Sequence, residues 1–335
     1  MIYYNSNGIK KIYMGNILIS EAYVGIQKVF PSEPQHDYSQ DYFTTIATES
    51  GTIRFSIESG VPTSFFSSIS YSTDSGNTWT TTNNVDEQEV TVNVNVNEGD
   101  KILWKGSGKA LGHGYYDQDY YAYYYDAHCN FYKYEGFEVE GNIMSLLNGD
   151  NFYGTQLDSE YTYQFVLLFA NSRITSAENL IFPQNTTWGC YNAMFSGCGY
   201  LKKAPQLPAT TLAQNCYGSM FDGCTSLTTV PSKLPATTLA NNCYYQMFYN
   251  CNALTTAPEL LAPTLVRNCY YQMFNGCRNL NYIKCLATNI SASNCTYGWV
   301  YNVASSGTFV KAASMTSWTR GNNGIPSYSW TVKDA

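Results

Sequence analysis

Apolar side chains in the second half of the chain recur in a block that is repeated about every 26 residues. Each block begins and ends with cysteine and carries Met-Phe between them. The four complete copies occupy residues 190–198, 216–224, 243–251 and 269–277. In the third copy, Cys243, Met247 and Cys251 stand at i, i+4 and i+8, which are positions on one face of a helix. Each block therefore predicts a short helix with one buried apolar stripe.

The residues around each block support a repeating unit. Glycine or asparagine stands just before the second cysteine, where a helix end needs a left-handed residue. These residues are Gly197, Gly223, Asn250 and Gly276. Thr237 and Thr238 are candidate N-caps of the third copy. Between the blocks, Leu-x-x-Ala/Val-Pro predicts a short strand that ends at its proline. A unit of strand, turn and helix has the length of a leucine-rich repeat, and stacked units share a continuous core.

The Met-Phe-x-Gly-Cys-x-x-Leu-x-x-Ala-Pro blocks resemble BspA-like leucine-rich repeat proteins of gut Bacteroidales and their phages. The resemblance covers roughly residues 160–303, and a degenerate fifth copy begins at Cys295. It implies an α/β solenoid with a surface or adhesive role and no catalytic residues. We assign the solenoid to 151–304 and a C-terminal cap to 305–335.

The first half of the chain has a different pattern. Residues 52–57 and 89–96 alternate polar and apolar positions and are punctuated by glycine, which predicts a β-sandwich-like domain over 34–150. Residues 1–33 contain two short strand-like pieces, each ending at glycine, followed by a proline-containing linker. A module this small buries little core of its own, so we expect it to dock on a partner. The predicted fold class is thus multidomain, β-sandwich followed by α/β solenoid.

One sharp motif lies inside the predicted sandwich. It matches the Asp-box, Ser/Thr-x-Asp-x-Gly-x-Thr-Trp, a hairpin in which the aspartate accepts hydrogen bonds from turn amides and glycine takes a positive φ. Its residues are Ser72, Asp74, Gly76, Thr78 and Trp79. Sialidases carry such hairpins, but so do many non-enzymatic β proteins, and we interpret this copy as structural.

The composition excludes several classes of protein. Charged residues make up 13% of the 335 residues and aromatic residues 16%, which excludes a disordered tail. A net charge of −7 leaves no basic stripe for nucleic acid. The longest apolar run, 165–170, is too short for membrane insertion. The N-terminus lacks the charged start and apolar core of a signal peptide. These features favour a virus-particle protein that folds in the bacterial cytoplasm and is released by lysis.

The eleven cysteines suggest three kinds of chemistry. Zinc sites use Cys-x2–4-Cys pairs, whereas the spacing here is Cys-x7-Cys, so we expect no metal and no cofactor. Two turns of one helix separate the pair too far for a disulfide, although cysteines of neighbouring coils could approach each other. We favour a ladder of reduced, buried thiols.

Residues 114–134 contain nine tyrosines, a density that suits contacts with sugars and proteins. The predicted contact set is Tyr120, Tyr121, Tyr123, Tyr124 and Tyr125. The alternatives are a subunit interface in a homo-oligomer and internal packing. The competing surface is the strand face of the solenoid, with Thr228, Thr229, Thr255 and Thr256.

These observations predict a non-enzymatic virion appendage, of fibre or tail type, on the virion surface. Its expected partners are other virion proteins, through residues 1–33, and a host surface glycan or protein. The first alternative is a BspA-like adhesin of the bacterial cell surface. The second is a glycan-cleaving enzyme, which rests on the Asp-box alone. Glu135, Glu138 and Glu140 alternate along a predicted strand, but nothing in the sequence singles them out as a catalytic carboxylate pair.

Overall fold

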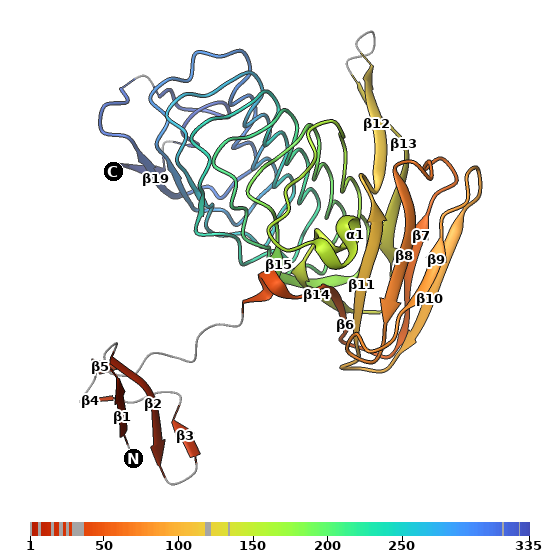
Figure 1. Ribbon diagram of the computed structural model, residues 1–335. Helices are drawn as coiled ribbons and strands as arrows, with labels where there is room; N and C mark the ends of the chain where they lie inside the picture. The colour runs from red at the N-terminus through yellow and green to blue at the C-terminus, as the bar shows by residue number, and fades with distance from the viewer. Residues whose placement is uncertain are drawn as a thin grey trace. The chain divides into compact units, whose positions relative to one another are not determined.

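The computed structural model consists of two compact units, Met1–Asp37 and Tyr38–Ala335 (Figure 1). It describes residues 2–5, 8–14, 17–19, 23–24, 27–28, 37–117, 122–132, 135–316, 318–327 and 329–335. Within this part of the chain, no helix is long and apolar enough to cross a membrane.

The first unit is built from short antiparallel strands. One sheet has the order β1 (Ile2–Asn5), β2 (Gly8–Met14), β3 (Ile17–Ile19). A second pair joins β4 (Tyr23–Val24) to β5 (Gln27–Lys28).

The second unit begins with two sheets. Their strands are β6 (Phe43–Ala47), β7 (Gly51–Ile57), β8 (Phe66–Ser72), β9 (Thr80–Asn83), β10 (Val90–Val96), β11 (Lys101–Gly108), β12 (Gly112–Asp117), β13 (Ala122–Tyr132), β14 (Phe137–Asn142) and β15 (Ile174–Ile181). One sheet has the order β10-β7-β13-β12, and the other has the order β15-β14-β6-β11-β8-β9. Short helical turns η1 (Tyr38–Gln40), α1 (Ser145–Asn148) and η2 (Gly149–Asn151) flank them.

An aromatic core joins the two sheets face to face. Phe55 and Phe131 of the four-stranded sheet lie 6.3 Å and 5.0 Å from Trp104 of the other sheet, measured between ring centroids. The alternation in β10 buries Val92, Val94 and Val96 and exposes the residues between them. This part of the chain therefore has the half-buried strands that its alternating pattern predicts.

The repeat region grows from the edge of the six-stranded sheet. Strand β15 pairs in parallel with β14, and Ser176 of β15 forms a parallel bridge with Lys203 of the next coil. The ring of Phe169 in the first coil lies 5.9 Å from Phe43 and 5.8 Å from Phe131. The hydrophobic core consequently runs without a break from the sheets into the repeats.

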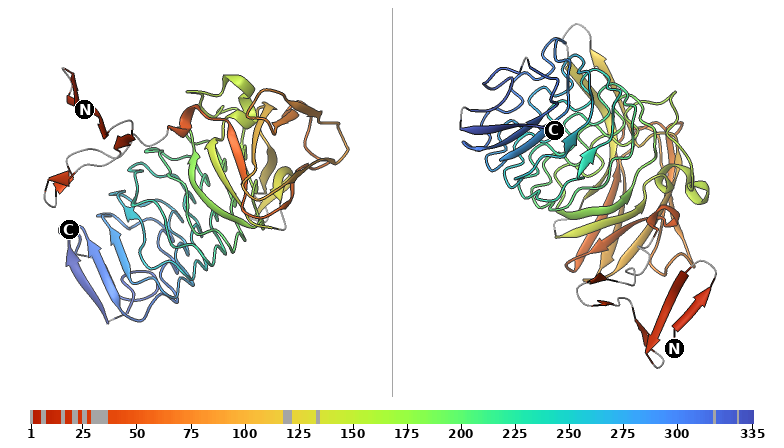
Figure 2. Two further views of the ribbon diagram at one scale, coloured as in Figure 1. Left: turned by 90° about the horizontal axis from the view of Figure 1, so that it is seen from below. Right: turned by 90° about the vertical axis from the view of Figure 1, so that its left-hand side faces the viewer.

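The repeats form a β-solenoid whose coils stack along the chain (Figure 2). One side is a parallel sheet in the order β16-β17-β18-β19-β20. Its strands are β16 (Lys233–Leu234), β17 (Glu259–Leu260), β18 (Tyr282–Cys285), β19 (Gly307–Lys311) and β20 (Trp330–Asp334). At the C-terminal end, Trp318 stacks on Trp299 of the last coil with a centroid distance of 5.6 Å.

The predicted helix in each repeat is wrong. Residues 160–303 contain no helix, and 243–251 form consecutive tight turns. The N–H of Met247 donates to Tyr244 O at 3.2 Å, and the N–H of Phe248 donates to Met273 O of the next coil at 2.9 Å. Thr238, expected as an N-cap, forms a parallel bridge with Thr211 of the preceding coil. Alternate N–H groups therefore join neighbouring coils, and this pairing replaces the helical ladder.

A left-handed residue at every fourth position explains the apolar stripe. Asn242, Gln246 and Asn250 have φ values of 58°, 51° and 56°. A left-handed residue interrupts a right-handed helix, so the period of four comes from turns. The buried i, i+4, i+8 stripe and the left-handed residue before the second cysteine are confirmed, but their cause is this turn period.

The side chains of successive coils stack in registered ladders. Tyr217 lies 5.6 Å from Tyr191 and 5.8 Å from Tyr244, with interplanar angles of 11° in both pairs. A phenylalanine ladder runs beside it through residues 169, 195, 221, 248 and 274. Because the repeat keeps nearly constant length, identical side chains meet, and their stacking buries a continuous core.

Candidate functional site

The tyrosine-rich segment forms a two-stranded arm, which we call the tyrosine arm (β12 with residues 122–128 of β13). Tyr124 pairs with Tyr115, and Tyr123 with Tyr116, in antiparallel register. Of the residues of β13, only 129–132 pair with β7, so the arm continues beyond the end of β7 (Figure 1). The structure thus brings the backbone of Tyr123, Tyr124 and Tyr125 into the arm. Tyr120 and Tyr121 lie outside the described residues.

The base of the arm is held by a half-buried contact between His128 and Glu58. His128 Nδ1 lies 3.1 Å from Glu58 Oε2, and the backbone N–H of His128 donates to the same oxygen at 2.9 Å. Burial lowers the pKa of His128, and the nearby Glu58 carboxylate opposes that shift. The arm is therefore anchored to the body at the residue where it leaves the sheet.

The Asp-box residues lie together in the β8–β9 hairpin. Asp74 accepts hydrogen bonds from Thr78 N at 2.9 Å, Thr78 Oγ1 at 2.6 Å and Ser72 Oγ at 2.7 Å. Gly76 has φ of +89°, and its carbonyl accepts the Trp79 Nε1–H at 3.1 Å. Bonds from Thr78 and then Ser72 lower the pKa of Asp74 to about 2. A carboxylate held ionised by its own turn is suited to fixing the hairpin.

Trp79 packs this hairpin against Tyr42 and Lys105 of the sheet domain. Its ring packs edge-on against Tyr42 at 5.1 Å, and Lys105 Nζ lies 4.1 Å from its centre. Lys105 and Tyr42 both donate to Asp150, at 2.8 Å and 2.6 Å. Burial, followed by the bond to Asp150, raises the pKa of Tyr42 to about 12. These contacts fix the hairpin to the rest of the sheet domain and are structural.

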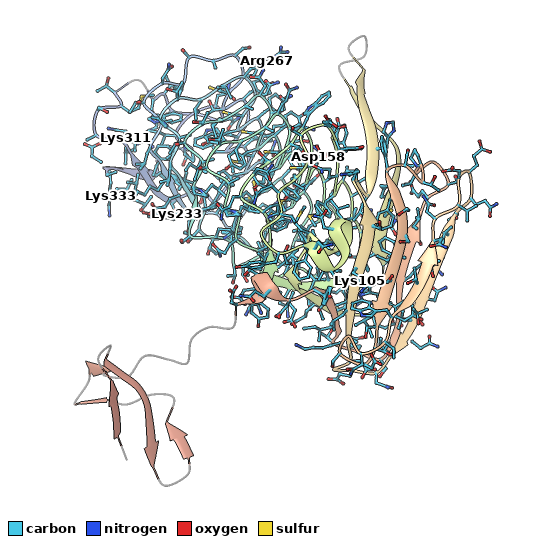
Figure 3. All side chains as sticks on the ribbon, viewed as in Figure 1. Lys105, Asp158, Lys233, Arg267, Lys311 and Lys333 are labelled. Carbon is cyan, nitrogen blue, oxygen red and sulfur yellow. The ribbon has the colours of Figure 1, made fainter. Side chains whose placement is uncertain are left out.

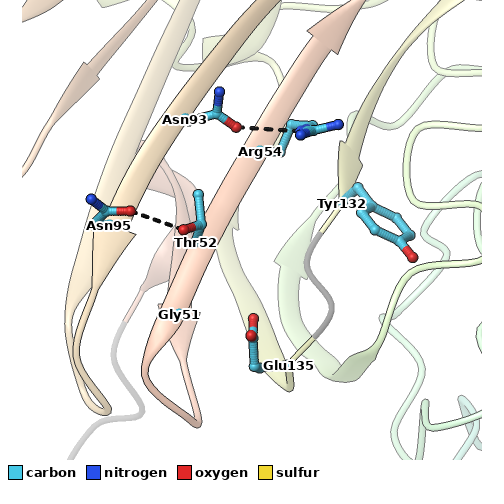
Figure 4. Close-up of a pocket in the computed structure, with 7 residues that line it drawn as sticks. All are labelled: Gly51, Thr52, Arg54, Asn93, Asn95, Tyr132 and Glu135. Carbon is cyan, nitrogen blue, oxygen red and sulfur yellow. Dashed lines mark hydrogen bonds between the residues drawn. The ribbon is translucent and has the colours of Figure 1, made fainter.

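A polar pocket of about 440 Å³, the sheet pocket, lies on the four-stranded sheet (Figure 4). Thr52 donates to Asn95 at 2.9 Å, and Arg54 donates to Asn93 at 3.3 Å. A Cβ atom on Gly51 would lie 2.3 Å from the Glu135 carboxylate, so the glycine makes room for that group. Tyr132, at the end of β13, completes the lining. Amide, guanidinium, phenol and carboxylate groups together suit hydrogen bonding to a polar ligand.

The sheet pocket was not predicted from the sequence. Its signal was present in the alternation, because Thr52 and Arg54 are the outward positions of β7, and Asn93 and Asn95 those of β10. Of the two other carboxylates named from the sequence, Glu140 bonds to Lys101 at 2.6 Å and Glu138 pairs through β14 with Ile46 of β6.

The strand face of the solenoid exposes the four predicted threonines. Thr228, Thr229, Thr255 and Thr256 are all exposed. Charged rungs accompany them: Lys203 bonds to Glu178 at 2.6 Å and Lys284 to Glu259 at 3.0 Å. Lys233, Lys311 and Lys333 also lie on this side, whereas Arg267 lies on the opposite side (Figure 3).

On the turn side, sequence reasoning missed a second aromatic row, the outer tyrosine ladder (Tyr245, Tyr271 and Tyr297). The first two rings lie 4.8 Å apart at an interplanar angle of 7°, and the last two lie 5.1 Å apart at 20°. The signal was a tyrosine two positions after the first cysteine of three consecutive copies.

All eleven cysteines are free and buried. Cys198, Cys224, Cys251 and Cys277 each donate the thiol hydrogen to a phenylalanine carbonyl of a preceding coil, at 2.9–3.1 Å. Burial raises the pKa of Cys198 and Cys277 to about 12. Among the described residues, no group of His, Cys, Asp and Glu is arranged to hold a metal ion.

Comparison with protein-family models, curated proteins and solved structures finds no match to this chain.

Proposed function

We propose that this chain is a non-enzymatic recognition protein of a phage particle, a fibre- or tail-type appendage component that contacts the host bacterial surface. Residues 1–33 attach it to other virion proteins. The tyrosine arm makes the outward contact, to a surface glycan or protein. The phage setting follows from the resemblance of the Met-Phe-x-Gly-Cys repeats to BspA-like proteins and from the composition.

The observation that carries the proposal is the tyrosine arm. It is a two-stranded ribbon whose β13 strand pairs with β7 only from residue 129 onward, and it pairs tyrosine with tyrosine at successive positions. Tyrosine offers a large contact area and loses little side-chain entropy on binding. A two-stranded ribbon that extends past its neighbouring strands gains little stability of its own, because two strands alone are marginally stable. Contacts with a partner would stabilise it.

The sheet pocket lies on the same strand as the arm. Strand β13 runs from the arm to Tyr132, which lines the pocket beside Arg54 and Glu135. One strand thus carries an aromatic contact element at one end and a polar pocket at the other. This arrangement supports recognition of an extended surface by one face of the protein.

The test replaces Tyr120, Tyr121, Tyr123, Tyr124 and Tyr125 by serine in the full chain. Binding to gut Bacteroidales cells and the mass of the assembly in solution are both measured. We expect lost cell binding at unchanged mass. Lost assembly would instead identify the arm as a subunit interface, and no change in either quantity would contradict the proposal. Imaging particles with an antibody to the solenoid tests the virion location.

The matched control replaces exposed tyrosines elsewhere. Tyr153 and Tyr200 are 64% and 51% exposed, and both lie outside the arm. The double variant Tyr153→Ser, Tyr200→Ser should bind cells as the wild type does. Equal losses in both variants would indicate a general effect of removing surface tyrosine.

A further inference from the structure

Two ladders on the turn side of the solenoid end in neighbouring coils, the amide ladder one coil before the outer tyrosine ladder. The outer tyrosine ladder ends at Tyr297, which is 48% exposed. Beside it, Gln246 donates from Nε2 to Gln272 Oε1 at 2.7 Å, in an amide ladder that the next coil interrupts with Gly298. Within the described residues, nothing accepts a hydrogen bond from Gln272 Nε2.

The interruption at Gly298 opens a cleft of about 610 Å³, the end cleft. Gly298 has φ of +61°, but Gln246 and Gln272 occupy the same left-handed position with φ of 51° and 49°. The backbone therefore tolerates a side chain there. A Cβ atom on Gly298 would lie 3.2 Å from Gln272 Cγ and 3.8 Å from its Nε2 group. The missing side chain leaves this donor facing the space that the ladder would have filled.

The far wall of the cleft is fixed by the cap. Asn323 Oδ1 accepts the Gly298 N–H at 2.6 Å, and Asn323 O accepts Thr296 Oγ1–H at 2.8 Å. Arg320 donates to Trp330 O at 3.0 Å and also to Ser327 O. The wall is therefore pre-formed, which lowers the ordering cost of binding.

We infer that the end cleft binds a single pyranose ring of a glycan. The C–H face of the sugar packs on the ring of Tyr297, because the face of an aromatic ring carries negative charge that attracts C–H groups. A sugar hydroxyl accepts the unpaired Gln272 amide hydrogen, and the cleft has the volume of a small-molecule site. The ligand thus fills the space that a side chain at position 298 would occupy and covers the exposed end of the outer tyrosine ladder. This site is separate from the tyrosine arm and does not depend on the function proposed for it.

The test uses the full chain and saturation-transfer NMR with the methyl pyranosides of glucose, galactose, mannose, N-acetylglucosamine and glucuronic acid. Each is supplied at about 10 mM, above the millimolar Kd expected of a one-ring site. We expect transfer to at least one pyranoside. A preference for the glucuronide would show that the Arg320 charge contributes, and no transfer to any of the five would overturn the inference.

Gly298→Gln is the decisive variant, because it continues the amide ladder and fills the cleft. It should weaken pyranoside binding at least tenfold while the thermal midpoint stays close to that of the wild type. Tyr297→Ser provides a second route if Gly298→Gln misfolds, and it should also weaken binding at least tenfold. Tyr245→Ser, at the inner end of the same ladder, is the matched control and should bind normally. Undiminished transfer in a folded Gly298→Gln or Tyr297→Ser variant, or equal loss in Tyr245→Ser, would place binding elsewhere and refute the site.

Discussion

Replacing Ser219 by glycine tests whether turns, and not helices, form the repeats. Ser219 occupies the middle left-handed position of its coil with φ of 52°, and it is half-buried. A non-glycine residue in this region carries about 1–2 kcal/mol of strain. Glycine removes that strain but loses about 0.5–1 kcal/mol more conformational entropy on folding. The balance predicts that Ser219→Gly stabilises the protein by about 0.5–1 kcal/mol.

A helix would reverse the sign, because glycine inside a helix costs about 1 kcal/mol. The matched control is Ser196→Gly, at a half-buried position that lies outside the left-handed region. It should destabilise the protein by about 0.5–1 kcal/mol. Guanidinium unfolding followed by circular dichroism measures both changes as shifts in midpoint at constant slope. If both variants lose similar stability, the turn-period argument is wrong.

Two further predictions concern buried groups. Thiol titration should label almost none of the eleven cysteines in the native protein and about eleven after unfolding, because burial raises their pKa values and blocks access; low labelling in both states would indicate disulfides. Burial also raises the pKa of Asp222 to about 6, so the native state loses stability as the pH rises from about 4 to 6. The variant Asp222→Asn should therefore be more stable than the wild type above pH 6, by about 1 kcal/mol after allowance for solvent screening. Thermal melts at pH 4 and pH 7.5 measure this gain, and an equal gain at both values would contradict the assignment.

The local sequence was sufficient to predict the structure where the stabilising contacts are local. All of the hydrogen bonds that Asp74 makes with side chains and turn amides come from residues 72–78, so the hairpin geometry is encoded in one short segment. The alternation in β10 likewise predicted its buried valines, because strand faces follow directly from a period of two. The 26-residue period predicted a stacked solenoid, and the glycines before the second cysteine predicted left-handed backbone.

The repeat conformation required the tertiary structure. An apolar residue at every fourth position fits both a helix of 3.6 residues per turn and a succession of four-residue turns. The choice depends on hydrogen-bond acceptors about 26 residues away, such as Met273 O for the N–H of Phe248. These acceptors exist only once neighbouring coils are in register.

The candidate sites also depend partly on the local sequence and partly on the tertiary structure. The tyrosines of residues 114–134 stood out from composition alone, but the arm exists because β13 continues past β7. The end cleft was invisible in the sequence, since Gly298 is one glycine among 25. It becomes a site because coil stacking places Gly298 after Gln246 and Gln272, next to the last exposed tyrosine of a ladder. Sequence determined which side chains recur, and the stacking of coils decided which of them meet, because a solenoid brings together residues that are one period apart.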